Sequence, residues 1–345
     1  LQTGLVRHEL AFGYDYVRRD MTFGPGFSGT IGTGNLFADS VLPQPILSVG
    51  ASYLQFRSNQ HSVFLSDTAK VLESVELFGV ARFTRFQNIR GTAPGTLVET
   101  YDESIVTPTV GLVYKLRPSL SLYASYAEGI EQGGTAPSNA INAGQVFDPL
   151  KSDQLELGAK WELAEGALLT VAAFEIDKGL EFLDAGSGLF VQNGRQVHRG
   201  LEASLAGRVG DRLRVIAGVA WLDAEVRRTA NLALIGKRPQ GVPEWQANLY
   251  ADYDLTPFVD GLSFNAGLYY TGDKAVDQLN TFMVDAFTRL DVGVRYRQRL
   301  SDRSSVIWRL TMENATDKRY LADTSFGSLV FGSPRSVRFS ATFDF

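Results

Sequence analysis

The last ten residues, SVRFSATFDF from Ser336 to Phe345, alternate between apolar and polar side chains without interruption. Successive side chains of a β-strand point to opposite faces, so the stretch predicts one apolar and one polar face. The apolar face carries Val337, Phe339, Ala341, Phe343 and Phe345, and the polar face carries Arg338, Ser340, Thr342 and Asp344. A strand of about ten residues with these two faces is typical of a transmembrane β-barrel, where one face meets lipid and the other a wet lumen. A two-sheet sandwich would also alternate, but with its apolar face inside.

The same period of two recurs along most of the chain, with full charges on one face only. The repeating segments are Ser119 to Tyr126, Gln154 to Trp161, Trp245 to Leu255, Ser263 to Thr271, Arg289 to Arg297 and Val306 to Glu313. In a membrane barrel, the apolar positions would face lipid and the charged positions the lumen. We therefore expect Val292, Leu310 and Phe339 on the lipid face, and Arg295, Arg309 and Arg338 on the lumen face.

The connections between these segments alternate between short and long. Short links are predicted at Leu72 to Ser74, Leu116 to Ser119, Ala164 to Ala167, Gly210 to Arg212, Thr256 to Gly261 and Leu300 to Ser304. Long links are predicted at Asp20 to Pro45, Asn88 to Glu103, Gly129 to Lys151, Lys178 to Gly188, Asp223 to Pro243, Gly272 to Asp285 and Thr316 to Pro334. Short periplasmic turns and long extracellular loops are typical of an up-and-down membrane barrel. We predict an all-β, antiparallel barrel domain over residues 1–345, with about fourteen strands from Thr3–Arg19 to Phe345.

Composition supports a strand-based membrane domain. Hydrophobic residues make up 44% of the chain, yet they form no run of the roughly 18 residues that indicates a transmembrane helix. The chain has no cysteine, which excludes disulfides and thiolate metal sites, and its net charge of −5 gives no basic footprint for nucleic acid. No change in composition marks a second domain. The chain begins at Leu1 without a Met or signal peptide, so we expect a piece of a longer exported precursor.

Several ordered blocks resemble TonB-dependent siderophore receptors. The blocks are Pro108 to Leu163; HRGLEASLAGRVGDRLRVIAGVAWLDAE with its G-hydrophobic-E strand; GKRPQGVPEWQANLYADYDL with R-x-x-G-x-P; and ENATDKRY with the later GSPR and the terminal aromatic residue. The resemblance implies a bacterial outer-membrane protein that takes up ferric siderophores, driven through the TonB energy-coupling system. It also implies that the outer-membrane assembly machinery recognises Phe345.

The resemblance further implies parts that this stretch does not contain. Family members carry an amino-terminal plug and a coupling box, and their barrel has roughly 22 strands. Thr3–Arg19 and the last strand would then expose edges that further strands should pair. Alternatives are a passive porin-like channel, an adhesin-like structural barrel, and a TonB-dependent receptor for cobalamin or an oligosaccharide.

No arrangement of residues predicts catalysis, a cofactor or a protein-bound metal. His8, His61 and His198 are far apart and lack metal-ligand spacing, and the glycines between Gly24 and Gly34 precede no helix pattern that would make a phosphate cradle. Loops of barrels carry recognition, and aromatic and cationic side chains suit an anionic ferric chelate. The candidate ligand-binding residues are Arg90, Tyr101, Phe147, Arg238, Tyr320, Phe326 and Phe331. The alternative for each is packing within its own loop. Charges on the lumen face could form ion pairs, contact a plug or simply be hydrated.

Overall fold

The structure is a computed structural model, and it describes residues 2–24, 32–34, 41–43, 52–93, 95–164, 166–256, 258–323 and 329–345. Most of the predicted loop from Asp20 to Pro45 lies outside the described residues, as does Phe326. The chain divides into two compact units. One comprises Leu1–Glu9, Asp67–Gly79 and Thr109–Phe345, and the other comprises Leu10–Ser66 and Val80–Pro108.

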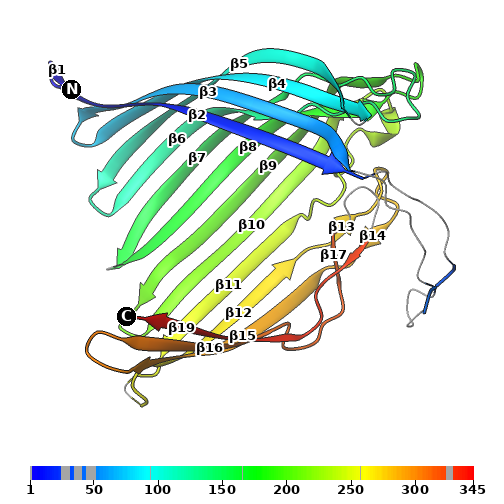
Figure 1. The fold of residues 1–345 in the computed structure, drawn as a ribbon. Coiled ribbons are helices and arrows are strands. Elements are labelled where there is room, and N and C mark those ends of the chain that lie inside the picture. Colours follow the sequence, from blue (N-terminus) through cyan, green and yellow to red (C-terminus); the bar gives the residue numbers. More distant parts are fainter. Residues whose placement is uncertain are drawn as a thin grey trace. The chain divides into compact units, whose positions relative to one another are not determined.

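The described residues form one large antiparallel sheet in which the strands follow their order in the sequence, as the colours of Figure 1 show. The sheet contains β1 (Gln2–Thr3), β2 (Val6–Phe23), β3 (Tyr53–Leu72), β4 (Val75–Ala93), β5 (Thr96–Arg117), β6 (Leu120–Glu131), β7 (Leu150–Ala164), β8 (Ala167–Leu183), β9 (Phe190–Val209), β10 (Leu213–Arg228), β11 (Trp245–Asp254), β12 (Leu262–Thr271), β15 (Phe287–Arg299), β16 (Ser305–Glu313) and β19 (Ser336–Asp344). Apart from the two-residue β1, these are the predicted fourteen strands. The up-and-down antiparallel order is thus confirmed.

Two small hairpins and one turn of 3-10 helix lie in the long connections. The hairpins pair β13 (Lys274–Ala275) with β14 (Met283–Val284) and β17 (Leu321–Asp323) with β18 (Val330–Phe331). The 3-10 helix η1 spans Leu232–Leu234. The described residues include no helix of the length and apolarity needed to cross a membrane.

All six predicted short links are confirmed, at residues 73–74, 118–119, 165–166, 210–212, 255–261 and 300–304. Gly261 shows why a glycine is needed in such a turn. Its φ is +74°, and a Cβ added there would lie 2.2 Å from the carbonyl oxygen of Arg297. A side chain at this position would be strained and would also clash with the neighbouring strand.

Several predicted boundaries are wrong, because backbone pairing extends farther than expected; β10, for example, continues to Arg228 inside the loop predicted from Asp223 to Pro243. The predicted strand Thr3–Arg19 is interrupted by a turn at Gly4, whose φ is +63°, so that β1 and β2 form a hairpin. The predicted loop from Asn88 to Glu103 is occupied by β4 and β5, which leave a connection of only residues 94–95. β8 continues to Leu183, so the loop predicted from Lys178 to Gly188 is confined to residues 184–189. Polar side chains do not prevent backbone pairing, and strands can therefore extend into water.

Contacts across the strands confirm the predicted division into two faces. Arg295 Nη2 donates to Asp252 Oδ1 at 2.9 Å, and Arg309 Nη1 donates to Thr342 Oγ1 at 3.2 Å. On the opposite face the rings of Trp308 and Phe339 stack with 5.8 Å between centroids.

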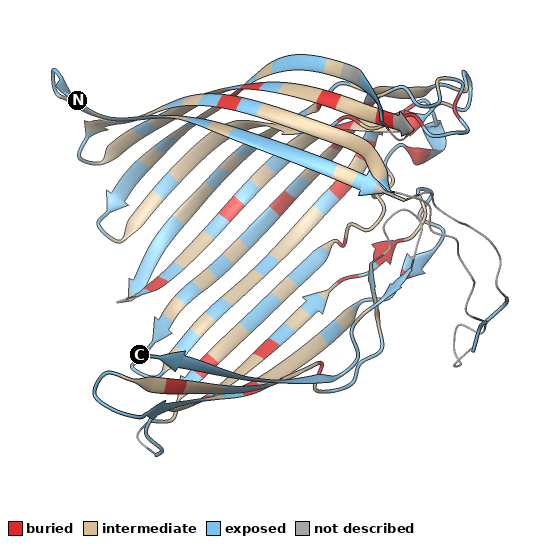
Figure 2. Cartoon of the chain, in the orientation of Figure 1, coloured by how far each residue is buried: buried red, intermediate tan, exposed pale blue. Residues whose placement is uncertain are grey.

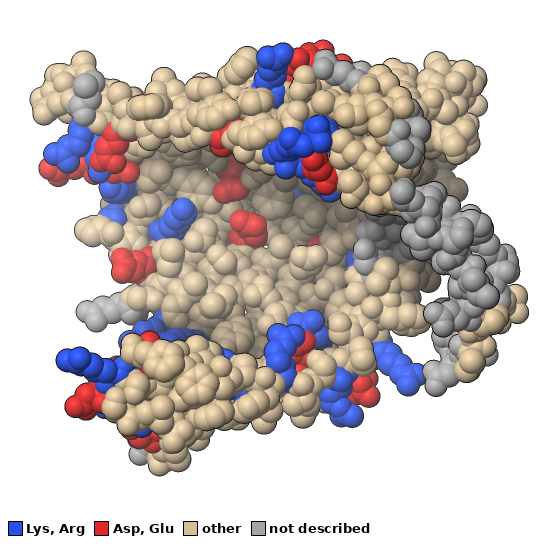
Figure 3. Space-filling model, viewed as in Figure 1, with Lys and Arg blue, Asp and Glu red and all other residues tan. Residues whose placement is uncertain are grey.

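The apolar face is exposed. Leu310 and Phe339 are 50% and 64% exposed, which excludes the sandwich, where such residues would be buried between sheets. Figure 2 shows the buried residues of the large sheet as isolated bands along its strands, with others in the connections. Figure 3 shows basic and acidic side chains next to one another, in agreement with ion pairs such as Arg338 with Glu313 at 3.1 Å.

Candidate ligand site at the loop ends of the strands

A cavity of about 320 Å³ lies where β8, β9 and β10 meet the connection that follows β10. It is lined by Leu180, Glu181, Phe182, Gln196, Val226, Thr229, Leu234, Arg238, Pro239, Gln240 and Gln278. Its volume is at the lower end of the range for small-molecule pockets in proteins. Five of these residues, Phe182, Gln196, Val226, Thr229 and Leu234, are at most 9% exposed. A single-layer sheet offers few buried positions, so this cluster marks a place where loops add a second layer.

Strand register places the lining residues on the face that carries the lumen charges farther along the strands. Val226 is paired with Gln196, and Gln196 with Lys178. Leu180 is paired with Gly194, where an added Cβ would lie 2.7 Å from the Leu180 carbonyl oxygen. The lack of a side chain at Gly194 lets the strands approach closely beside the cavity.

Near the loops, the polarity of the two faces of the sheet is exchanged. On the opposite face, Leu201 is 54% exposed, as expected for a lipid contact. Two residues farther toward the loops, the same face carries Arg199, whose Nε lies 2.5 Å from Glu175 Oε2. Charges thus occupy the outward face near the loops, while apolar residues such as Val226 turn to the inner face. The reversal marks the level at which the apolar band ends.

The 3-10 turn η1 inserts one leucine into the cavity and leaves another in solvent. Asn231 caps this turn, because its Oδ1 accepts from the Ala233 N–H at 3.1 Å. Leu234 is 7% exposed and lines the cavity, whereas Leu232 is 81% exposed. The two residues therefore offer a matched pair for mutagenesis.

Arg238 joins two long connections next to the cavity. Its guanidinium lies 3.1 Å from Glu244 Oε2 and 3.1 Å from Asp273 Oδ2. Its backbone N–H donates to Asn280 Oδ1 at 2.8 Å, and Asn280 Nδ2 donates to its carbonyl oxygen at 2.9 Å. Gly241, of the same R-x-x-G-x-P block, donates its N–H to the Ala275 carbonyl oxygen at 3.0 Å. The R-x-x-G-x-P block therefore links residues 229–244 to residues 272–286 through hydrogen bonds and an ion pair.

Glu181, near the end of β8, likewise holds a long connection to the strands that line the cavity. Its two carboxylate oxygens accept from the Gly134 N–H at 2.9 and 3.0 Å, and Gln192 Nε2 donates to Oε1 at 3.0 Å. Asn142 holds the same connection to the start of β9, exchanging hydrogen bonds of 2.8 and 3.0 Å with the backbone of Phe190. Residues 132–149 and 184–189, which we term the first loop cluster, are thereby fixed to the ends of β8 and β9.

A second loop cluster comprises residues 229–244, 272–286 and, in the last connection, 314–323 and 329–335. Lys274 is 5% exposed and its Nζ donates to the Ala322 carbonyl oxygen, which links the second of these connections to the third. The loop of residues 272–286 is also braced by Asp277, which accepts from the Phe282 N–H at 2.7 Å. This hydrogen bond holds the pKa of the Asp277 carboxyl below its usual value.

The carboxy-terminal motifs bind each other and close the last connection. Asn314 is 1% exposed; its Nδ2 donates to the carbonyl oxygens of Lys318 at 2.9 Å and Ser333 at 3.1 Å, and its Oδ1 accepts from the Lys318 N–H at 2.8 Å. Asp317 Oδ1 accepts from the Arg335 N–H at 3.1 Å. N-x-x-D-K-x-Y therefore fastens G-x-P-R, which lies directly before β19.

Of the seven residues predicted to bind ligand, the structure places Arg238 at the cavity. Phe147 packs edge-on against Phe190 at 5.5 Å within the first loop cluster, and Tyr320 stacks on Phe287 at 4.1 Å. Phe331 is 59% exposed in β18, and Arg90 and Tyr101 lie in β4 and β5 of the other unit. Phe326 lies outside the described residues. Phe147, Tyr320 and Phe331 do not line the cavity, and the role of all six residues in binding remains a prediction.

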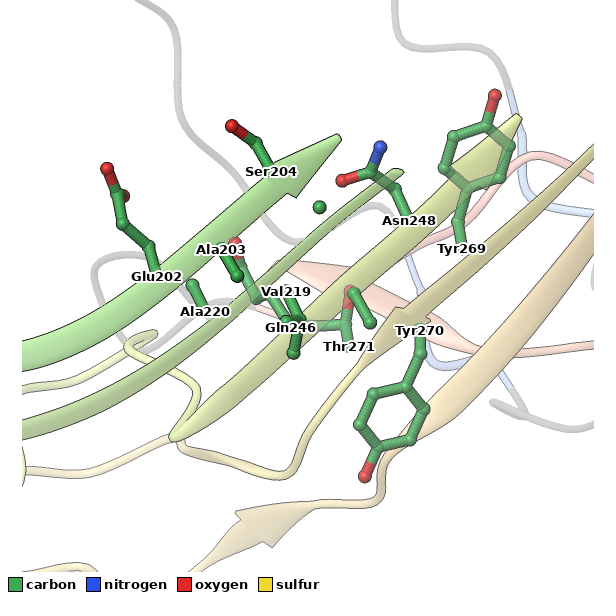
Figure 4. Close-up of a pocket in the computed structure, with 12 residues that line it drawn as sticks. Glu202, Ala203, Ser204, Val219, Ala220, Gln246, Asn248, Tyr269, Tyr270 and Thr271 are labelled. Carbon is green, nitrogen blue, oxygen red and sulfur yellow. The ribbon is translucent and has the colours of Figure 1, made fainter. Parts of the chain in front are cut away.

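A second hollow of about 410 Å³ lies along β9–β12. Figure 4 shows Tyr269 and Tyr270, both among its lining residues, pointing to opposite sides of β12. On the polar face, Gly218 leaves room for the side chain of Asn248, because an added Cβ would lie 2.8 Å from Asn248 Oδ1. Because its lining comes from both faces of the sheet, this hollow is not a single enclosed site. Among the residues that the structure describes, no three His, Cys, Asp or Glu side chains are grouped to hold a metal ion.

The long antiparallel strands, the exposed apolar face and the loops gathered at one end define a transmembrane β-barrel protein. The chain belongs to the TonB dependent receptor-like, beta-barrel family, whose model matches residues 1–315. It is 29% identical over 357 aligned positions to the ferrichrome receptor FcuA of Yersinia enterocolitica, covering 99% of this chain and 46% of that receptor.

Two further comparisons agree. The chain is 26% identical to the ferrioxamine receptor of Yersinia enterocolitica, with coverage of 100% of this chain and 49% of that protein. The crystal structure of BauA, the ferric preacinetobactin receptor of Acinetobacter baumannii, superimposes with a TM-score of 0.83 and 31% identity, covering 100% of this chain and 52% of that one. The chain thus spans about half the length of these relatives.

Proposed function

We propose that this chain is the barrel portion of a bacterial outer-membrane receptor for energy-dependent uptake of a ferric siderophore. The observation that carries the proposal is the cavity at the loop ends, lined by β8–β10 and by the second loop cluster on a membrane-spanning sheet. The family, and the siderophores in the names of the relatives, favour transport of a chelate over catalysis. The proposed partners are the ferric siderophore, the lipid bilayer around the apolar face, and the TonB system acting through other parts of the full-length protein.

The decisive experiment measures uptake of radioactive iron, supplied as a siderophore chelate, by cells with and without the full-length gene. Uptake should require the gene, and it should also require a functional TonB system. Replacement of residues 132–149 by a short Gly-Ser linker removes the Gly134 N–H that Glu181 holds, and it should weaken chelate binding while the protein still reaches the membrane. Uptake that persists without TonB would instead support a passive channel.

We further propose that the outer-membrane assembly machinery recognises the end of the chain. Phe345 is 96% exposed and follows β19 directly, so it is accessible to a partner. Removal of Phe345 should lower the amount of full-length protein in the outer membrane, while the molecules that do assemble bind chelate normally. Immunoblots of membrane fractions, with binding measured per assembled receptor, separate the two effects. Normal membrane levels would contradict the proposal.

A further inference from the structure

We infer that the cavity between β8–β10 and the second loop cluster receives an uncharged part of the ligand, and that the chelate is a neutral ferric hydroxamate rather than a polyanionic one. The inference rests on the proposed function and adds the chemical class of the chelate. It follows from three properties of the lining: its apolar wall, its neutral amides, and the way in which its charged groups are already paired.

The apolar wall is formed by Leu180, Phe182, Val226 and Leu234. Three of these side chains are at most 9% exposed, although they surround an open volume at the edge of a membrane protein. Removing such surface from water stabilises a complex with an apolar group of a ligand. The wall therefore suits the alkyl or acyl segments that link the metal-binding groups of a chelator.

The polar part of the lining consists mainly of uncharged groups. Gln196, Gln240 and Gln278 contribute amides, and Thr229 contributes a hydroxyl. Gln240 Nε2 donates to the Val276 carbonyl oxygen, which orients this amide at the cavity. An amide can both donate and accept hydrogen bonds, so it complements neutral carbonyl and N–O groups without requiring a charge on the ligand.

Two of the lining residues, Glu181 and Arg238, are charged, and both have partners in the protein. Arg238 contacts two carboxylates, Glu244 and Asp273, and Glu181 accepts from the first loop cluster. The Arg238 guanidinium and the carboxylates of Glu181, Glu244 and Asp273 are therefore all in contact with groups of the protein. Lys178, the next residue toward the membrane on the inner face of β8, is paired with Glu131 at 2.6 Å. Both charged residues of the lining are thus engaged within the protein, so neither offers an unpaired cation to an anionic chelate.

The charge of a ferric chelate depends on its donor groups. Three hydroxamates each lose one proton and balance Fe³⁺, so the complex is neutral. Three catecholates each lose two protons, so the complex carries a charge of 3−. Because the cavity combines apolar and amide groups with charged groups that are already paired, it matches the neutral complex.

The test uses the purified full-length receptor in detergent, with a hexadentate ferric trihydroxamate and a hexadentate ferric triscatecholate as probes. Titration calorimetry should show at least tenfold tighter binding of the trihydroxamate, with less than a twofold change between 50 and 500 mM NaCl. Leu234→Glu should weaken binding of the trihydroxamate by at least tenfold. Leu232→Glu, on the exposed side of the same turn, should leave binding unchanged.

A second variant keeps the inference testable if Leu234→Glu fails to fold. Gln278 lies at the exposed rim of the cavity, so Gln278→Lys adds a cation without disturbing buried side chains. It should tighten binding of the triscatecholate at least threefold and leave the trihydroxamate within twofold.

Preference of the wild-type receptor for the triscatecholate would overturn the inference. So would equal effects of the Leu234→Glu and Leu232→Glu variants, or an unaltered affinity for the triscatecholate in Gln278→Lys. If the receptor binds neither probe, the inference also fails. Gene-dependent and TonB-dependent iron uptake would in that case show that the proposed function survives.

Discussion

The strands β8–β10 and most of the strands from β11 onward differ in length, and therefore in how far they extend beyond the bilayer. β8, β9 and β10 have 17, 20 and 16 residues, whereas β11, β12, β16 and β19 have only 9 or 10. About 9 to 11 residues suffice to cross a bilayer. The longer strands therefore continue beyond the lipid and form a wall of the cavity themselves. Beside the shorter strands, the second loop cluster reaches a similar level and is held by side-chain ties such as Arg238 and Asn314.

The comparison predicts that the same substitution has different costs at the two heights. Val292 lies on the apolar face of the short-strand region, so Val292→Arg should destabilise the folded protein by about 2 to 4 kcal/mol if it lies near the membrane midplane. Val197 lies on the corresponding face of β9, paired with Asp177 and Glu225 above the apolar band. There Val197→Arg should cost about 0 to 1 kcal/mol. Denaturant titrations in lipid vesicles measure both values, and equal costs would contradict a membrane boundary between them.

The ties of the second loop cluster should show the next largest effect. Asn314→Asp keeps the acceptor for the Lys318 N–H but loses both donated hydrogen bonds, so it should destabilise the closed loop by about 1 to 3 kcal/mol. Asn231→Asp is the matched control, because the Asn231 side chain only accepts a hydrogen bond, from the Ala233 N–H, and an aspartate can accept it too. Limited proteolysis between residues 314 and 335 should accelerate in the first variant only.

The first loop cluster should respond more locally. Glu181→Ala removes the acceptor for the Gly134 N–H, so residues 132–149 should exchange their amide hydrogens faster. The strands β8 and β9 keep their backbone ladder, so the global unfolding transition should move little. Glu181→Gln retains one acceptor oxygen and should give an intermediate exchange rate. Exchange that accelerates equally throughout β8 would show that Glu181 supports the sheet itself.

The smallest expected effect is a dependence on pH confined to residues 272–286. The folded-state pKa of Asp277 lies below 3.8, the ordinary value for an aspartate, chiefly because the carboxylate accepts a hydrogen bond from the Phe282 N–H. The folded loop therefore gains stability from the ionised group above pH 3.8 and loses it as the pH falls through the lower folded-state pKa. Protection factors, which divide out the intrinsic pH dependence of amide exchange, should differ most between pH 3 and pH 6 in this loop, and Asp277→Asn should reduce the difference. A loop with equal protection factors at both pH values would contradict the prediction.

The sequence was sufficient to predict the strands, the faces and the turns, because a period of two and the membrane impose one pattern on each strand. It did not predict the cavity. Leu180 and Val226 occupy the face that is polar nearer the membrane, and their role depends on contacts with loops distant in the sequence. The reversal of polarity at Glu175 and Arg199 was the available signal. The extension of β4 and β5 into the predicted loop from Asn88 to Glu103 was missed because polar residues were interpreted as loop, although backbone hydrogen bonds hold a strand regardless of side-chain polarity.

The clasp between Asn314 and the residues before β19 has a consequence for how the last strand is added to the sheet. β19 contacts β16 along nine pairs from Glu313 with Ser336 to Ser305 with Asp344, and all nine of its residues are exposed. A shift of one residue would bring Arg338 or Ser340 to the lipid side in place of Phe339, which the membrane disfavours. A shift of two residues keeps the same faces, so the alternation alone does not fix the alignment of the strand. The hydrogen bonds of Asn314 and Asp317 hold Ser333 and Arg335 at a fixed position relative to the end of β16. They therefore determine at which residue the final strand begins to pair.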